Sequence, residues 1–360
     1  MTTAALTERA LRPLDELRRL TLRALAVDWP VARALAARRS VRVPALLTVH
    51  ALAALALSVL APSFLLAVGP LVFGVPHLAA DVRHLLVRRA SPRWWLGASA
   101  GFALALIAVR ALAETGVRRV PLSLEHALAA AWVMLGAAGG VMAGRHRAGA
   151  RAWAVLAGAG ALAAFAIAAP RTFRMALLHG HNLIAVVIWL VVFRRQWRLA
   201  WLPVAIVLAG AAALAGGVAV ATTVQHGALS VFGLHVFAAA DWLAPGVSDT
   251  RALAITTSFA FLQSIHYAIW LIAIPAADRP GDGGRAWRTA WRDLGRDLRP
   301  AGLWLVVALA VLVAVAGVMN MEPTRRLFLS LATFHGWLEL AALAYLLARG
   351  RAPVGARSAS

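Results

Sequence analysis

A short segment, residues 74–84, places three ionisable side chains in an otherwise apolar stretch. His77, Asp81 and His84 are spaced i, i+4, i+7, so on a helix all three share one face. Ionisable groups at the depth of a bilayer core are costly, and they usually face the protein interior and mark function. Imidazole and carboxylate groups in that setting indicate a functional site, and together they are what a buried metal site needs.

Three later apolar segments also carry a histidine with a second polar group on the same face. The pairs are His179 with Asn182, His266 with Gln263, and His335 with Glu339. Each of the four histidines lies 11 to 15 residues before the first arginine of the loop or tail that follows its segment. That spacing is roughly 16–22 Å of helix, near the middle of an apolar core about 30 Å thick. Because the four segments run in the same direction, their imidazoles are expected at one level.

Four imidazoles at one level predict a buried metal site. Imidazole suits iron, zinc and copper, and iron with open positions suits oxygen chemistry. The predicted ligands are His77, His179, His266 and His335, with His181 and His84 as weaker candidates. His179 and His181 point about 200° apart on a helix, so one of them faces the centre, and the spacing to Asn182 favours His179.

Two carboxylates lie one turn beyond this level, Asp81 and Glu339. Carboxylates beside metal-binding histidines act as ligands or as acceptors that orient the imidazoles. We predict that both belong to the catalytic site.

The composition predicts a polytopic membrane protein. The chain has 360 residues, 61% of them apolar, and no cysteine; its mean hydropathy is +0.75. Without cysteine, disulfides, thiolate metal sites and cysteine nucleophiles are excluded. Apolar runs long enough to cross a bilayer recur along the chain. The predicted fold is an all-α bundle of about ten spans: 44–62, 66–87, 95–113, 121–143, 150–169, 175–193, 200–221, 252–275, 302–319 and 327–348.

The arginines indicate an orientation. The net charge of +21 comes with no lysine, and 27 of the 36 arginines lie in the termini and in alternate loops. Short loops rich in arginine stay in the cytoplasm. We therefore expect a bacterial inner-membrane protein with both termini cytoplasmic, whose basic charge faces membrane lipids and not nucleic acid.

Three parts of the chain are distinguished on this basis. Residues 1–43 are expected to form a cytoplasmic basic segment with an amphipathic helix at the membrane surface. Residues 44–348 form the bundle, and 349–360 a short cytoplasmic tail. Segment 222–251 is apolar but too interrupted to span; it is expected to be an outer-side helix or a re-entrant piece that covers a cavity.

The segment from Gly74 to Asp81, Gly-Val-Pro-His-Leu-Ala-Ala-Asp, resembles the Gly-Leu/Ile-Pro-His-Gly-x-x-Asp signature of the Brp/Blh family, although Leu78 replaces the usual glycine. Members of that family are polytopic membrane iron enzymes that cleave β-carotene to retinal with dioxygen. The resemblance implies that His179, His266 and His335 are the counterparts of the family's later histidines.

The leading hypothesis is a membrane dioxygenase that uses Fe(II), mononuclear or dinuclear, on a lipophilic substrate drawn from the bilayer. Haem b, held by histidines in an electron-transfer protein, is an alternative, and so is transport of a metal ion or small solute, because polar midplane residues also line substrate routes.

Overall fold

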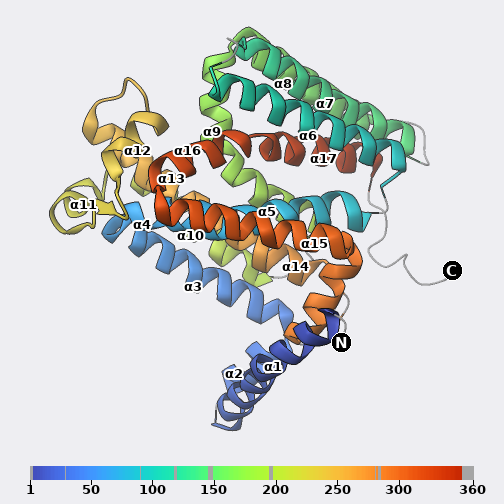
Figure 1. Ribbon diagram of the computed structural model, residues 1–360, viewed down its shortest axis with the longest axis vertical. Helices are drawn as coiled ribbons and strands as arrows, with labels where there is room; N and C mark the ends of the chain where they lie inside the picture. Colours follow the sequence, from blue (N-terminus) through green and yellow to red (C-terminus); the bar gives the residue numbers. More distant parts are fainter. Residues whose placement is uncertain are drawn as a thin grey trace.

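The computed structural model describes residues 3–28, 30–89, 91–116, 120–144, 149–193, 198–279, 281–282 and 285–350. It is almost entirely helical, and ten of its helical segments are long and apolar enough to cross a membrane. The predicted all-α bundle is confirmed. Figure 1 shows the long helices running roughly side by side, with α1 (Thr3–Asp28) and α2 (Pro30–Ala37) at one end and α11 (Val220–His226) and α12 (Val236–Leu243) at the other.

The second span is built from several short helical pieces. It begins after α3 (Arg39–Leu60) and consists of α4 (Pro62–Val68), the π-helical turn η1 (Gly69–Phe73), α5 (Gly74–Asp81), the π-helical turn η2 (Val82–Leu86) and the 3₁₀ turn η3 (Val87–Arg89). Pro70 and Pro76 lack the N–H that a regular helix needs, so the backbone widens near them. Single π-turns inside helices are frequent at functional sites.

One half of the bundle is formed by α6 (Arg93–Glu114), α7 (Leu122–Ala143), α8 (Ala150–Ala168) and α17 (Phe334–Arg349). Glycines on α7 let it approach α17 closely. A Cβ added at Gly136 would lie 2.4 Å from the Ala341 carbonyl oxygen, and one at Gly140 would lie 2.4 Å from that of Tyr345. Small residues at a helix interface allow this backbone-to-backbone packing in membranes, and the packing fixes the position of α17.

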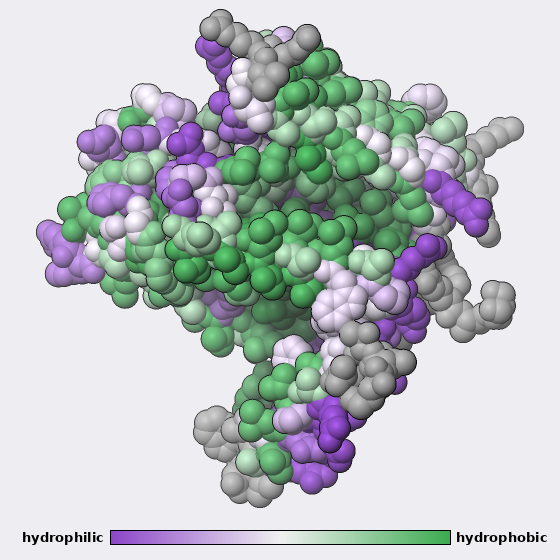
Figure 2. Space-filling model, in the orientation of Figure 1, coloured by the Kyte–Doolittle hydropathy of each residue, from purple (hydrophilic) through white to green (hydrophobic). Residues whose placement is uncertain are grey.

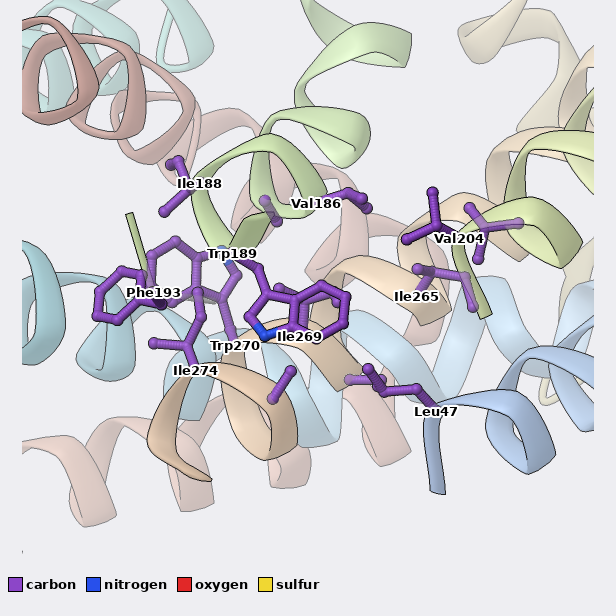
Figure 3. Close-up of a cluster of buried hydrophobic side chains, with 14 of the residues drawn as sticks. Leu47, Val186, Ile188, Trp189, Phe193, Val204, Ile265, Ile269, Trp270 and Ile274 are labelled. Carbon is purple, nitrogen blue, oxygen red and sulfur yellow. The ribbon is translucent and has the colours of Figure 1, made fainter. Parts of the chain in front are cut away.

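The other half packs around α13 (Asp249–Ala268), the most deeply buried span. Helices α3, α9 (Pro170–Ile188) and α10 (Trp201–Ala215) surround it. Figure 3 shows the apolar cluster between them, where Trp189 and Trp270 lie together near Phe193. The π-helical turns η4 (Trp189–Phe193) and η6 (Ile269–Ala273) carry these aromatic residues, and α14 (Ile274–Ala277) follows η6. The short 3₁₀ turn η5 (Arg198–Ala200) leads into α10.

The segment between α10 and α13 contains α11, a two-stranded hairpin of β1 (Ser230–Val231) and β2 (Leu234–His235), and α12. The seventh span ends at Ala215, earlier than the predicted 221, because Gly217 takes a φ of +84° and ends the helix. Helix α12 packs on α13, and its residues Asp241 and Trp242 line a cavity inside the bundle. A re-entrant course for this segment in a membrane stays a prediction.

Helix α15 (Trp287–Met319) begins before the predicted span 302–319 and is kinked at Arg299, which has a φ of 61° and precedes Pro300. It is followed by α16 (Met321–Leu331), which leads into α17. Helix α1 docks on the start of α15, where Asp15 accepts a hydrogen bond from the Trp287 backbone N–H at 2.6 Å. Leu14, Leu17 and Leu20 of α1 are exposed; a position at the membrane surface stays a prediction. Most of the predicted tail, 351–360, lies outside the described residues.

The surface agrees with a membrane setting. Figure 2 shows a broad apolar face across the middle of the molecule, with hydrophilic residues gathered toward two opposite ends. Exposed leucine, valine and tryptophan side chains on α10 and α15 contribute to it. Arginines and aspartates gather at the end nearest α1 and α15.

Asp278, just after α14, is the centre of an ion-pair network at that end. It accepts a hydrogen bond from His84 Nδ1 at 2.8 Å and pairs with Arg88 at 2.9 Å and Arg89 at 3.2 Å. Burial alone would raise the pKa of Asp278, but the His84 hydrogen bond and the arginine charges outweigh it and hold its pKa below the ordinary value of 3.8. The ionised carboxylate thus joins α13 to the second span.

We expect Asp278→Asn to lower the free energy of unfolding at pH 7 by about 3 kcal/mol, because the arginines lose a buried partner. Since the pKa is lowered on folding, this stabilisation is complete above pH 3.8 and disappears as the pH falls through the lower value of the folded protein. Thermal unfolding in nanodiscs at several pH values measures the difference. Asp249→Asn, at the exposed start of α13, is the control; an equal loss there would contradict the role of Asp278.

Candidate metal centre

Four histidine rings from four spans meet inside the bundle. His77 lies on α5, His181 on α9, His266 on α13 and His335 on α17. Five ring-to-ring contacts join them, with centroids 5.0 to 5.7 Å apart. One ligand atom from each of His77, His266 and His335 lies within 4.8 Å of the others, and all three side chains are buried. We call these four residues the histidine cluster.

Backbone carbonyl groups fix the orientation of three of these rings. The Nδ1 atom of His77 lies 3.1 Å from the Phe73 carbonyl oxygen, and that of His335 lies 2.5 Å from the Ala332 carbonyl oxygen. The Nδ1 atom of His181 lies 3.0 Å from the carbonyl oxygen of Leu178. A carbonyl oxygen only accepts, so each Nδ1 carries the proton and each Nε2 keeps its lone pair. This is the tautomer in which histidine binds a metal through Nε2.

Several nitrogen atoms of the histidine cluster are buried without a hydrogen-bond partner among the described residues. They are Nε2 of His77, Nε2 of His335 and both ring nitrogens of His266. A buried polar atom left unpaired costs about 1–3 kcal/mol. Two imidazole nitrogens on one ion lie about 3–4 Å apart, given metal–nitrogen bonds of about 2.0–2.1 Å. Small side-chain rotations therefore bring these atoms to bonding distance, and the buried triad could hold a metal ion.

Local backbone features place the histidines. His77 follows Pro76 in the first turn of α5, which begins directly after the turn η1. The carbonyl partner of His77, Phe73, is the last residue of η1. On α17, Gly336 lies beside His181: a Cβ built there would sit 3.6 Å from the Cβ of His181, which is an ordinary van der Waals contact. The Tyr267 ring packs on His77 with centroids 4.8 Å apart.

The two carboxylates lie beside the histidine cluster and are fully buried. Glu339 Oε1 accepts a hydrogen bond from Trp270 Nε1 at 2.7 Å and lies 3.6 Å from His266 Nε2. The distance of 3.6 Å is too long for a hydrogen bond, so both ring nitrogens of His266 stay available to an ion beside this carboxylate. Both carboxylate oxygens of Asp81 and both amide atoms of Asn182 also lack hydrogen-bond partners in the described part of the chain.

The structure differs from the sequence analysis at one ligand. His179 points away from the histidine cluster; its Nε2 donates to the Leu243 carbonyl oxygen at 2.9 Å, and its ring packs on Phe259. His181, the weaker candidate, contacts His266 and His335 instead. Asn182, whose spacing favours His179, has no hydrogen-bond partner among the described residues, so it does not orient α9. The rotation of α9 is set by its packing against α13 and α17.

His84, the other weaker candidate, also lies apart from the cluster. Its Nδ1 bonds Asp278, and its ring packs on Phe193. This places His84 in the ion-pair network at the arginine-rich end.

A cavity of about 320 Å³ extends from the histidine cluster to the end of the bundle near α12. Its inner part is lined by the cluster and by apolar and aromatic side chains, among them Leu177, Phe259, Tyr267 and Trp337. Charged residues line its outer part: Arg110, Glu114, Glu125, Arg174, Asp241 and Arg326. A pocket of this size and apolar character accommodates a lipophilic small molecule.

Comparisons of the chain with protein-family models, curated proteins and solved structures give no match. The fold and site together define a helical membrane-type bundle with a buried histidine triad that could hold a metal ion.

The paired histidines of α9 provide a direct test of this geometry. We expect His181→Ala to lower the metal content of the purified protein by about tenfold or more, because it removes a ring from the cluster. His179→Ala, two residues away on the same helix, should keep its metal because it removes only the bond to Leu243. Elemental analysis of both variants measures the effect. Loss of metal in His179→Ala alone would contradict the arrangement.

Proposed function

We propose that this chain is an integral-membrane non-haem iron oxygenase that acts on a lipophilic substrate in the manner of carotenoid cleavage. The observation that carries the proposal is the set of unpartnered imidazole nitrogens on the wall of an apolar cavity. An all-nitrogen site with open positions suits iron and dioxygen. The resemblance of residues 74–81 to the Brp/Blh signature supports the same chemistry.

In this proposal each part of the site has a role. His77, His181, His266 and His335 would hold the iron, which would supply the binding and activation of dioxygen beside a double bond of the substrate. The bond from Trp270 fixes the carboxylate of Glu339 at 3.6 Å from His266 Nε2. Asp81, one turn after His77 and with both carboxylate oxygens unpartnered among the described residues, would orient the bound ligands or hold a second ion. The apolar walls keep water from the reacting groups.

The packing of the rings favours an ion over haem b. The histidine rings contact one another edge to face at 5.0–5.7 Å between centroids. A bis-histidine haem needs its macrocycle between the two ligating rings. A single ion needs only the small central space toward which the unpartnered nitrogen atoms are directed.

The arginine distribution supports a location in the bacterial cytoplasmic membrane with both termini in the cytoplasm. The cavity would then open toward the outer face, near α12. Substrate would enter from the lipid or from that face, and dioxygen, which is apolar, from the lipid.

Expression in a β-carotene-producing bacterial host tests the reaction class. We expect the wild-type chain to bleach the carotene and release retinal, and His77→Ala, His266→Ala and His335→Ala each to reduce cleavage by at least about 10²-fold, because each removes a ring that holds the iron. Extraction and chromatography measure both compounds. Undiminished colour with the metal-loaded wild-type chain would contradict carotenoid cleavage.

The absence of cysteine allows a clean test of orientation. Two positions at opposite ends of the spans suit single cysteines: Arg198, on η5 at the start of the seventh span, and Thr115, directly after α6. We expect a membrane-impermeant thiol reagent to label Thr115→Cys in intact cells and Arg198→Cys only after lysis. The reverse pattern would contradict the proposed orientation.

A further inference from the structure

A second cavity, of about 290 Å³, lies at the arginine-rich end of the bundle, away from the histidine cluster. It is bounded by α3, the turns η2 and η3, the end of α13 with η6 and α14, and the start of α15. Five arginines line it, and none of its lining residues is acidic: Arg42, Arg83, Arg88, Arg279 and Arg285. We call it the arginine groove.

The arginines of the groove are only partly compensated by carboxylates behind it. Arg83 pairs with Asp297 at 2.8 Å, Arg88 shares Asp297 and Asp278, and Arg285 pairs with Asp293. The same carboxylates also serve other arginines, since Asp278 pairs with Arg89 and Asp293 with Arg296. Positive charge therefore exceeds negative charge around the groove.

Neighbouring arginine charges around the groove lower the pKa values of two of its arginines, Arg279 and Arg285. Burial lowers the pKa of Arg279, and the nearby charges of Arg42 and Arg39 lower it further. Burial and the charges of Arg83 and Arg88 likewise lower the pKa of Arg285. The neighbouring arginine charges disfavour the protonated forms, Asp282 and Asp297 oppose this effect on the pKa of Arg279 and of Arg285 respectively, and an anion in the groove would oppose it further.

Two polar atoms of the groove lining are buried without a hydrogen-bond partner in the part of the chain described. They are Nη2 of Arg83, whose side chain is 9% exposed, and Nε2 of His84, whose side chain is 2% exposed. Another nitrogen atom of each side chain already donates a hydrogen bond: Nε of Arg83 to Asp297, and Nδ1 of His84 to Asp278. Arg83 Nη2 is thus an unused N–H donor beside the groove, whereas His84 donates through Nδ1 and its Nε2 carries a lone pair that offers an anion no donor.

Four apolar side chains also line the groove: Leu46 of α3, Leu271 and Ile272 of η6, and Leu294 of α15. A free inorganic anion gains nothing from apolar lining residues, whereas a phospholipid has both a phosphate and acyl chains. Arginine is suited to phosphate through paired N–H donors, and basic pockets between spans bind lipid headgroups.

We infer that the arginine groove is a binding site for an anionic phospholipid, with the phosphate among Arg42, Arg83 and Arg279 and the acyl chains along Leu46 and Leu271. The lipid would join the second span to α3 and α15. The inference is independent of the reaction at the histidine cluster.

Titration of phosphatidylglycerol into phosphatidylcholine nanodiscs that hold the full chain, read by native mass spectrometry, tests the site. We expect the wild-type chain to retain phosphatidylglycerol in preference to phosphatidylcholine. The double variant Arg42→Gln/Arg279→Gln should bind it about thirty-fold more weakly, since it removes two charges near the headgroup. Ala290→Leu, which fills the groove without a change of charge, should weaken binding as well.

Arg198→Gln is the matched control, because Arg198 is exposed on η5 at the same end and does not line the groove. An equal loss of phosphatidylglycerol in this control would overturn the inference in favour of general surface attraction. Unchanged binding in the double variant and in Ala290→Leu would also overturn it. So would displacement of the lipid by inorganic phosphate, which would assign the groove to a soluble anion. If the double variant unfolds in phosphatidylcholine alone, Ala290→Leu decides.

Discussion

The hydrogen bonds from imidazole Nδ1 to backbone carbonyl groups are the interaction on which the site depends. In an apolar interior every polar atom needs a partner. The bonds to Phe73, Ala332 and Leu178 satisfy one nitrogen of each ring and leave the other directed at its neighbours. The cluster is therefore incomplete as a hydrogen-bonded structure, and a cation at its centre would complete it. Both ring nitrogens of His266 also lack a partner among the described residues, and the carboxylate of Glu339, which accepts a hydrogen bond from Trp270, lies 3.6 Å from its Nε2.

The rest of the fold holds four helices at the spacing that these bonds require. Glycines of α7 bring α17 close to its neighbours. The widened turns η1 and η6 flank the histidine-bearing helical turns of the second and eighth spans. At the arginine-rich end, Asp278 ties the eighth span to the second. The same bundle thus supports a buried site, a cavity leading to it and an anchoring network.

Much of the fold could be predicted from sequence, because long apolar runs have few alternatives in a membrane-type bundle. The ten spans were predicted, and most of their ends lie within a few residues of the prediction; the seventh span ends early at Gly217, and α15 begins well before its predicted span and is kinked at Arg299. The common depth of His77, His266 and His335 could also be predicted, from the number of residues between each histidine and the arginines that follow its span. The choice between His179 and His181 could not be predicted, because it depends on the rotation of α9 against α13 and α17. Helix rotation is set by contacts between helices, and periodicity within one helix does not contain it.

The central claim is that the histidine cluster binds an iron ion and no haem. Elemental analysis and the visible absorption spectrum of the purified wild-type protein test it together. The account predicts stoichiometric iron with no Soret band. A Soret band, or a folded protein that stays free of metal after incubation with Fe(II), would contradict it.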